Sequence, residues 1–458
     1  MKHVHLIGIG GTGLAPIARV LHERGILVSG SDRVISPLAQ ELAALGISIV
    51  QGHAAENVRG ADTVVRSSAV PESNPEVQEA HRLGIPVYRR EEFLSTLVGD
   101  LQAVAVAGTH GKTTTTAMLA WCMVQAGLDP SYIIGSTSKN LHSNARAGNS
   151  RFFVIEADEY DNMFLGLHPQ VAVLTILEHD HPDCFPTMEL YRQAFKRFVG
   201  QIKPGGLLVT CNDFAETASA GDWAPPATTV LTYGLSEKAE VCAKDVSVNA
   251  QGKTNFTVWR AERAVTRVCL PFTGDHNVRN ALAVLAVFDQ MGWPVVKAAA
   301  ALGEFQGAGR RFDLLGEAAG VTVIDDYAHH PTEIAATLQA AHARFAGRRI
   351  WAVWQPHTYS RTRTLETEFI TALQFADQVL VTEIYAARET DPGYSSRQLV
   401  EKVNRQSVRY GSSFGEIVAT LNSELKPGDV LLVLSAGNAN EISVQVLDNL
   451  QKKEKKNG

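Results

Sequence analysis

A short loop with two glycines holds the residues whose types and spacing most clearly predict chemistry. It follows a run of small apolar residues and precedes an expected helix that continues through Ala117. Two glycines allow backbone N–H groups to close around an anion at the positive end of a helix. Lys112 then supplies a charge for the β and γ phosphates, and the hydroxyl of Thr113 is placed to bind magnesium. The loop consists of Gly108, Thr109, His110, Gly111, Lys112, Thr113 and Thr114.

This loop is a shortened form of the usual nucleotide-binding pattern, because Val106 stands where that pattern has its first glycine. A Gly-Lys-Thr triplet alone also arises by chance or as a helix cap. The strand before the loop and the helix after it favour a nucleoside triphosphate site.

Two later predicted strands deliver groups that suit a hard cation. The strand at 152–156 ends in Glu156, and the strand at 171–177 leads to His181. If these strands run parallel to the loop strand, all three end at one edge of the sheet, where ligands bind in open α/β folds. We therefore expect Thr113, Glu156 and His181 to bind magnesium. Two alternatives are a zinc site made by His179, His181 and Cys184, and a helix-capping role for His181.

The beginning of the chain contains a second glycine pattern. Gly8, Gly10 and Gly13 have the GxGxxG spacing between a strand and a helix, and Asp32 ends the next strand, where a ribose hydroxyl would lie. The same pattern also marks tight strand–helix packing. It predicts a nucleotide or phosphate cradle on a βαβ unit.

Three further groups of side chains are candidates for ligand binding. Asn277 and Asn280 begin a helix, where their amides could bond an adenine edge, although capping would explain one of them. Arg310 and Arg311 follow a glycine-rich hinge and are either surface charge or a contact to the γ phosphate. Loops near the C-terminus predict a basic lining for a carboxylate or phosphate, made by His329, His330, His357, Arg361 and Arg363.

Strands and helices alternate along the whole chain and predict an α/β protein of three domains. We expect a Rossmann-like domain at 1–99, a central P-loop ATPase-like domain at 100–311 and a Rossmann-like domain at 312–458. In the last domain the pattern predicts strands at 321–326, 350–354, 378–383 and 430–434, and helices at 333–345 and 365–375. A length of 458 residues agrees with three domains at about 150 residues each.

The composition is that of an ordinary soluble protein. A net charge of −6 without a basic stripe argues against nucleic acid as a partner. The sequence contains no apolar run of the roughly 20 residues that span a bilayer, and it begins with a strand rather than a signal peptide. The five cysteines form no CxxC pair and are expected to be reduced. We expect a cytoplasmic protein with no membrane partner.

Nine motifs, taken together and in order, resemble those of the Mur ligases over nearly the whole chain. They are GIGGTGL (8–14), SGSD (29–32), SSAV (67–70), AGTHGKTTTT (107–116), EADEYD (156–161), GDHNVRNA (274–281), GRRF (309–312), DDYAHHPTE (325–333) and QPHTYSRTR (355–363).

The resemblance implies an ATP-dependent ligase of peptidoglycan precursor synthesis, and hence of cell wall biogenesis, cell shape and cell division. It implies that L-alanine is joined to the carboxylate of UDP-N-acetylmuramate through an acyl phosphate. ATP and Mg²⁺, with Mn²⁺ as an alternative ion, would be the cofactors, and the protein would be a monomer or homodimer.

The resemblance also assigns roles to residues. Lys112, Arg311 and His329 would be catalytic, with Arg311 on a phosphate and His329 assisting deprotonation of the amine. The loop 108–114 would bind ATP together with Asn277, Asn280 and Arg311, and the metal would lie at Thr113, Glu156 and His181. Tyr327, His329, His357 and Arg361 would face the muramyl carboxylate and the amino acid. The sugar nucleotide would be bound by Gly8, Gly10, Gly11, Thr12, Gly13, Ser31, Asp32, Ser67 and Ser68.

The chain departs from the family pattern at two positions. Ile176 stands where relatives often have asparagine, and Thr358 stands where some have an arginine. Several Mur ligases carry a carbamylated lysine after the metal histidine, but the expected register places Phe195 there, so Lys196 receives no role.

Three other functions compete with this interpretation. A recycling ligase that joins UDP-N-acetylmuramate to a murein tripeptide would share both nucleotide sites. An NAD-dependent oxidoreductase would explain the first glycine pattern but not the second phosphate loop. A nonenzymatic nucleotide-binding protein would bind ATP through Lys112 without turnover.

Overall fold

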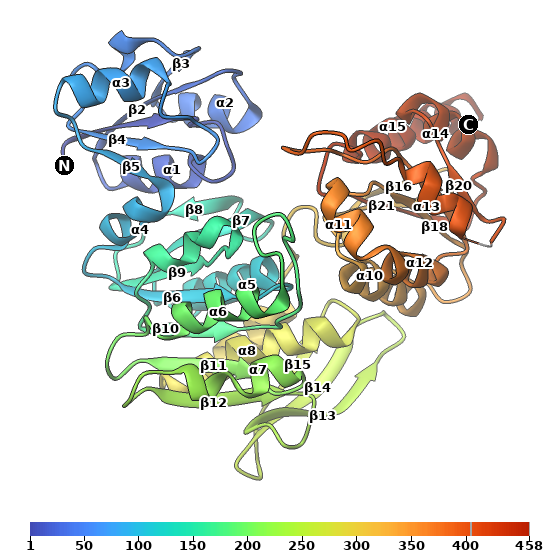
Figure 1. Ribbon diagram of the computed structural model, residues 1–458. Helices are drawn as coiled ribbons and strands as arrows, with labels where there is room; N and C mark the ends of the chain where they lie inside the picture. The colour runs from blue at the N-terminus through green and yellow to red at the C-terminus, as the bar shows by residue number, and fades with distance from the viewer. Residues whose placement is uncertain (404, 458) are drawn as a thin grey trace.

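The computed structural model describes residues 1–403 and 405–457 and contains three sheets that follow one another along the chain (Figure 1). The α/β fold class expected from the sequence is confirmed. The boundaries at 99/100 and 311/312 fall between regular elements, after α4 and before β16, and the assignment of a separate ligand to each domain stays a prediction.

The N-terminal domain is a parallel sheet of five strands in the order β3-β2-β1-β4-β5. The residues of β1 from Val4 to Ile7 are buried, as expected for a central parallel strand covered on both faces. Its elements are β1 (His3–Ile7), α1 (Ala15–Glu23), β2 (Leu27–Asp32), α2 (Pro37–Ala44), β3 (Ser48–Gln51), η1 (Ala55–Val58), β4 (Thr63–Arg66), α3 (Pro75–Arg82), β5 (Val87–Arg89) and α4 (Arg90–Val98).

The first part of the central domain carries the phosphate loop. The strands β10, β6 and β9 are parallel neighbours, with Val106 of β6 opposite both Glu156 and Val173. The phosphate loop, Glu156 and the segment after β10 therefore lie at one edge of the sheet, as predicted. The elements are β6 (Gln102–Ala107), α5 (Lys112–Gln125), β7 (Ser131–Ser138), β8 (Ser143–Arg146), β9 (Phe152–Glu156), η2 (Tyr160–Gly166), β10 (Val171–Leu174) and α6 (Met188–Val199).

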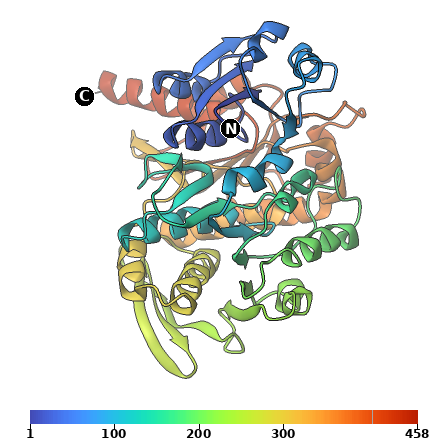
Figure 2. The same cartoon turned by 90° about the vertical axis from the view of Figure 1, so that its left-hand side faces the viewer.

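The second part of the central domain completes its ten-stranded sheet, in the order β15-β14-β13-β12-β11-β10-β6-β9-β7-β8. Strands β13 to β15 pair antiparallel and extend away from the other domains at the lower end of Figures 1 and 2. The elements are β11 (Leu207–Cys211), α7 (Ala215–Ala218), η3 (Ala220–Trp223), β12 (Thr229–Gly234), β13 (Val241–Val248), β14 (Thr254–Arg260), β15 (Arg263–Leu270), α8 (Asp275–Gln290) and α9 (Val295–Gly303).

The C-terminal domain has a six-stranded sheet in the order β16-β17-β21-β18-β19-β20. Only β16, at the edge, runs antiparallel to its neighbour. Its elements are β16 (Asp313–Ala318), β17 (Val321–Asp326), α10 (Pro331–Arg344), β18 (Ile350–Trp354), α11 (Tyr359–Thr364), α12 (Glu366–Ala372), η4 (Leu373–Phe375), β19 (Gln378–Val381), α13 (Ser396–Lys402), β20 (Val408–Tyr410), α14 (Phe414–Glu424), β21 (Val430–Leu434) and α15 (Asn440–Asn457).

The hydrophobic core joins the first two domains but not the third. Residues of β1, such as Leu6, belong to the same buried cluster as Phe153 of β9 and Phe195 of α6. Every member of the two clusters in the C-terminal domain lies beyond residue 311. The C-terminal domain therefore has a core of its own, and its side-chain contacts to the central domain described below are polar. Interfaces of this kind permit relative domain motion.

Several expected elements differ from the structure in their extent: the strand expected at 378–383 ends at Val381, and the helix expected at 333–345 runs from Pro331 to Arg344. Two larger differences have a local cause. The strand expected at 171–177 ends at Leu174, because the chain leaves the sheet there and Thr175 turns its hydroxyl to the phosphate loop. The helix expected at 365–375 is divided into α12 and η4, and α11 forms just before it, where the Thr358 hydroxyl accepts a bond from the Arg361 N–H.

Candidate active site

The phosphate loop connects β6 to α5, and its two glycines are required by geometry. Gly108 has φ +135° and Gly111 has φ +81°, a range that L side chains rarely adopt. A Cβ at Gly108 would lie 2.1 Å from the Thr175 hydroxyl, and one at Gly111 would lie 2.7 Å from Oδ1 of Asn280. Only glycine allows the loop to pack this closely, and it leaves the positive end of α5 as an anion site.

The amine of Lys112 is held inside this loop. It donates to the carbonyls of Gly108 (2.6 Å) and Thr109 (3.1 Å) and to the carboxylate of Glu159 (2.9 Å). Burial lowers the pKa of Lys112, but the charges of Glu159 and its acidic neighbours raise it more, so the amine stays a cation. Glu159 is fully buried and also accepts a hydrogen bond from Tyr191.

Of the three residues predicted to bind magnesium, Thr113 and Glu156 are in contact with each other, and His181 lies beside them. The Thr113 hydroxyl donates to Glu156 at 2.9 Å, and the guanidinium of Arg311 lies 3.4 Å from the same hydroxyl. Burial raises the pKa of Glu156 despite the opposing charges of Lys112 and Arg311. The Glu156 carboxylate is therefore costly to ionise unless a further cation is bound. Together with the Thr113 hydroxyl it offers the oxygen ligands that a hard divalent ion prefers.

His181 occupies a neighbouring position. Its Nε2 lies 3.6 Å from Glu159, and its Nδ1 is 3.4 Å from the guanidinium of Arg361. Because Glu159 also binds Lys112, His181 is joined to the phosphate loop through Glu159 rather than by contact with Glu156. Its role as a metal ligand stays a prediction.

The alternative zinc site is not assembled. His179 is bound to the Phe185 carbonyl at 2.7 Å. Among the residues that the structure describes, the His, Cys, Asp and Glu group close enough for a metal ion is His110, Glu178 and His330, which includes neither His181 nor Cys184.

The predicted amino-acid end of the site is a row of rings on loops of the C-terminal domain. His329 lies between Tyr327 and His357, with ring centroids 5.4 Å and 5.8 Å away. Burial lowers the pKa of His329 to about 4, against the opposing charge of Glu333, and burial lowers that of His357 to about 2. Both imidazoles are therefore neutral near pH 7, the state in which a histidine can accept a proton.

Arg361 is 2% exposed and faces the central domain. Its Nε donates to Asp180 at 2.7 Å, and its other nitrogens contact His357 and His181. The same residue therefore fixes the loop of the predicted metal histidine and a histidine of the third-domain row.

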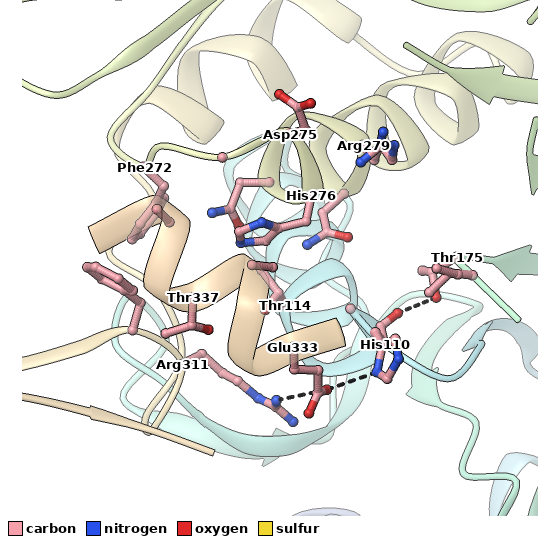
Figure 3. Close-up of a pocket in the computed structure, with 18 of the residues that line it drawn as sticks. His110, Thr114, Thr175, Phe272, Asp275, His276, Arg279, Arg311, Glu333 and Thr337 are labelled. Atoms are coloured by element: carbon pink, nitrogen blue, oxygen red, sulfur yellow. Dashed lines mark hydrogen bonds and ion pairs between the residues drawn. The ribbon is translucent and has the colours of Figure 1, made fainter. Parts of the chain in front are cut away.

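A cavity of about 620 Å³ lies between the phosphate loop, α8 and α10 (Figure 3). Asn280 packs against Gly111 and lines this cavity, together with Asn277, whose amide donates to the Thr273 carbonyl. Neither asparagine caps α8, because its N-cap residue is Gly274 and no side chain that the structure describes bonds the free N–H groups there. Phe272 and Phe305 add apolar walls. The cavity adjoins the phosphate loop and has the mixed lining expected for a nucleotide base.

The glycine loop of the N-terminal domain is held by Asp32, whose carboxylate accepts the Gly10 N–H at 2.9 Å. Gly8 approaches Ser67 so closely that a Cβ would lie 3.1 Å from the serine Cβ, while Gly11, Thr12 and Ser68 are exposed beside them. A Cβ at Gly13 would lie 2.8 Å from Nη1 of Arg90, so a larger residue there would clash with that guanidinium. Ser31 is fully buried and donates to Glu76 at 2.6 Å, so its predicted contact with a sugar nucleotide stays untested.

Four important residues have no role in the sequence analysis. Glu159 and Glu333 stand inside motifs quoted above, and Asp180 directly precedes His181. Only the fold shows that Glu159 pairs with Lys112, Glu333 with His110 and Asp180 with Arg361. Arg90 begins α4 and reaches the first glycine loop; its Nε is buried without a hydrogen-bond partner.

Three family models match successive parts of the chain. They describe the Mur ligase family catalytic domain (residues 3–100), the Mur ligase middle domain (106–288) and the Mur ligase glutamate ligase domain (310–437). The UDP-N-acetylmuramate--L-alanine ligase of Acidithiobacillus ferrooxidans is 43% identical over 453 residues, covering 97% of each chain. The chain belongs to the Mur ligase family. The enzyme of the same name from Frankia casuarinae is 41% identical, again over 97% of each chain.

Solved structures show the same relationship for this Mur ligase. The UDP-N-acetylmuramate-alanine ligase MurC of Thermotoga maritima has a TM-score of 0.82 at 29% identity and covers 99% of this chain and 100% of its own. A murein peptide ligase from Psychrobacter arcticus has a TM-score of 0.72 at 26% identity, with 98% and 99% covered. Membership of this ATP-dependent ligase family excludes the NAD-dependent oxidoreductase as an account of the chain. In the part of the chain that the structure describes, no helix is long and apolar enough to cross a membrane.

Proposed function

We propose that this Mur ligase joins L-alanine to the carboxylate of UDP-N-acetylmuramate with hydrolysis of ATP to ADP and phosphate, as a step of peptidoglycan precursor synthesis. The observation that carries this proposal is full-length identity of 43% to an enzyme named for that reaction. The geometry supports it, because a phosphate loop, a carboxylate edge and a row of neutral histidines meet where the central and C-terminal domains touch.

In the first step a carboxylate oxygen of the sugar nucleotide attacks the γ phosphorus, the bond to ADP breaks and an acyl phosphate forms. Negative charge gathers on the transferred phosphoryl group, and the cations of Lys112 and Arg311 are placed to offset it. Thr113 and Glu156, with His181 as a further candidate, would hold the Mg²⁺ or Mn²⁺ ion, which when bound offsets charge on the phosphates.

In the second step the amine of alanine attacks the acyl carbon, and the tetrahedral intermediate releases phosphate. The amine must first lose a proton, because an ammonium group has no lone pair for attack. His329 is our candidate to accept this proton, since its imidazole is neutral and lies in the third-domain row. Positioning of the two reactants by the closed domains contributes to the rate without a proton transfer.

The other ligand sites follow the family resemblance. The loop from Gly8 to Gly13 would cradle the diphosphate of the sugar nucleotide, with Asp32, Ser67 and Ser68 towards the uridine. Asn280 and Asn277 would face the adenine, and Arg361 the carboxylate end of the amino acid. The protein would act in the cytoplasm as a monomer or homodimer.

Phosphate release from ATP, Mg²⁺ and UDP-N-acetylmuramate tests the proposal. One reaction receives L-alanine and another receives the tripeptide L-Ala-γ-D-Glu-meso-diaminopimelate. We expect release only with L-alanine. Release only with the tripeptide would make the protein the recycling ligase, and no release in either reaction would contradict both.

A further inference from the structure

Glu333 occupies the third position of α10 and fixes the loop that carries His329. Its Oε2 accepts the backbone N–H of His329 at 3.1 Å and that of His330 at 3.4 Å. This is the reciprocal half of a capping box, in which a glutamate closes the first turn of its own helix. Helix capping therefore explains the contacts of Oε2, one of the two carboxylate oxygens.

The other oxygen reaches across the domain interface. Oε1 of Glu333 lies 3.1 Å from Nδ1 of His110 in the phosphate loop and 3.9 Å from the guanidinium of Arg311 (Figure 3). Both partners are candidate phosphate-site residues, and both precede the C-terminal domain in the chain. A single carboxylate thus contacts the ATP loop and the loop of the candidate base.

His110 is held between two carboxylates. Its other ring nitrogen lies 3.1 Å from Glu178 of the central domain. Burial lowers the pKa of His110, but Glu333 and Glu178 raise it to about 9, so the ring is an imidazolium. Burial raises the pKa of Glu333, while the charges of His110 and Arg311 bring it well below its usual range. The pair is therefore ionic, largely buried and shared between two domains.

A glutamate that only caps a helix does not need to be buried or paired with cations. Glu416 caps α14 in the same domain by accepting the Ser412 N–H at 2.8 Å, and it is exposed. The Glu333 side chain is only 13% exposed. Burial of a charge is unfavourable unless it is paired, so the position of Glu333 at the interface calls for a role beyond capping.

We propose that Glu333 is a positioning residue that couples the nucleotide loop to the C-terminal domain, by holding His110 on one side and the His329 loop on the other. The inference rests on the proposed function only for the identity of the reaction. The role of Glu333 in domain closure does not depend on that identity. When the contact is made, the third-domain row is placed over the phosphate loop. When it is lost, ATP still binds to the loop, but the second substrate site is not assembled above it.

The test compares Glu333→Gln with the matched control Glu416→Gln, which alters the same capping position of a helix in the same domain. Domain closure is followed by small-angle X-ray scattering with a non-hydrolysable ATP analogue, Mg²⁺ and UDP-N-acetylmuramate. Affinity for the analogue is measured in parallel. We expect Glu333→Gln to keep the Kd of the analogue within about 3-fold, to remain open, and to lower kcat at least ~30-fold, within the range that misplacement of reacting groups costs. Glu416→Gln should behave like the unaltered protein.

A double-mutant cycle with His110→Asn separates positioning from helix capping. If the two residues act through their mutual contact, the second substitution should add less than about 3-fold to the loss in kcat caused by the first. Independent, multiplicative losses, or a Glu333→Gln variant that closes normally, would overturn the inference. The closure measurement requires no alanine, so the two proposals can fail separately. If the protein closes through Glu333 but forms no alanyl product, the proposed function is refuted and this inference stands.

Discussion

Asp180 and Arg361 form a buried ion pair between two domains, with Oδ1 of the aspartate 2.7 Å from Nε of the arginine. Asp180 precedes the predicted metal histidine in the central domain, and Arg361 belongs to α11 of the C-terminal domain. Their side chains are 4% and 3% exposed. Burial raises the pKa of Asp180, but the charge of Arg361 brings it well below its usual range. The pair fixes the orientation of the arginine that is expected to meet the amino acid.

We predict that Asp180→Asn raises the KM for L-alanine at least ~10-fold, because loss of one partner leaves a buried guanidinium uncompensated, at a cost of about 3 to 5 kcal/mol. The Kd for ATP should change little. Asp183→Asn is the control: it removes a more exposed partner of Arg388, and such pairs contribute only about 0 to 1 kcal/mol. Equal effects of the two substitutions on KM would contradict this role of Asp180.

Lys112 has a structural role as well as a catalytic one. Lys112→Met should abolish turnover and also destabilise the central domain by about 3 to 5 kcal/mol, because it leaves Glu159 buried without that cation. Urea unfolding followed by a central-domain signal measures the stability. The double variant Lys112→Met with Glu159→Gln should regain most of the stability but no activity. A double variant as unstable as the single one would refute this pairing.

The predicted metal site gives a prediction about divalent ions. Chelation with EDTA should stop phosphate release, and excess Mg²⁺ should restore it. Glu156→Gln should raise the Mg²⁺ concentration for half-maximal rate by more than the ~10–100-fold that loss of an outer-shell partner costs. Asp161→Asn, an exposed residue of the same acidic run, serves as the control. An unchanged Mg²⁺ dependence in Glu156→Gln would place the ion elsewhere.

Glu76 provides a pH test in the N-terminal domain, away from the reaction. Burial raises its pKa, but His5, Ser31 and Asn57 lower it more, to about 2 from an ordinary value of 4.5. A depressed pKa stabilises the fold above the unfolded-state value, and this contribution is lost as the pH falls from about 4.5 towards 2. Glu76→Gln should therefore be less stable at pH 7 by about 3 kcal/mol, and the difference should shrink below pH 4.5. A pH-independent difference in chemical unfolding would contradict the assignment.

The sequence predicts the parallel cores of the three sheets well, because apolar runs such as 152–156 and 350–354 become buried strands with those bounds. The edge strands β8, β16 and β20 are not predicted. They are short or carry polar residues, and their extended conformation depends on the neighbour with which they pair.

The same distinction holds for the site. The phosphate loop is predictable because its glycines, lysine and threonine are adjacent in the chain. Glu333 is not, because its second partner, His110, lies more than two hundred residues earlier, and its local pattern indicates only a helix cap. Ser31 shows the opposite case: its position at a strand end predicts a ligand contact, but its hydroxyl faces the buried Glu76.

Isotope transfer tests the central claim most directly. UDP-N-acetylmuramate with ¹⁸O in its carboxylate is incubated with ATP, Mg²⁺ and L-alanine, and product and phosphate are analysed by mass spectrometry. An acyl phosphate pathway predicts an alanyl product that retains one ¹⁸O and a released phosphate that contains the other. Absence of the alanyl product, or its formation with unlabelled phosphate, would contradict the account.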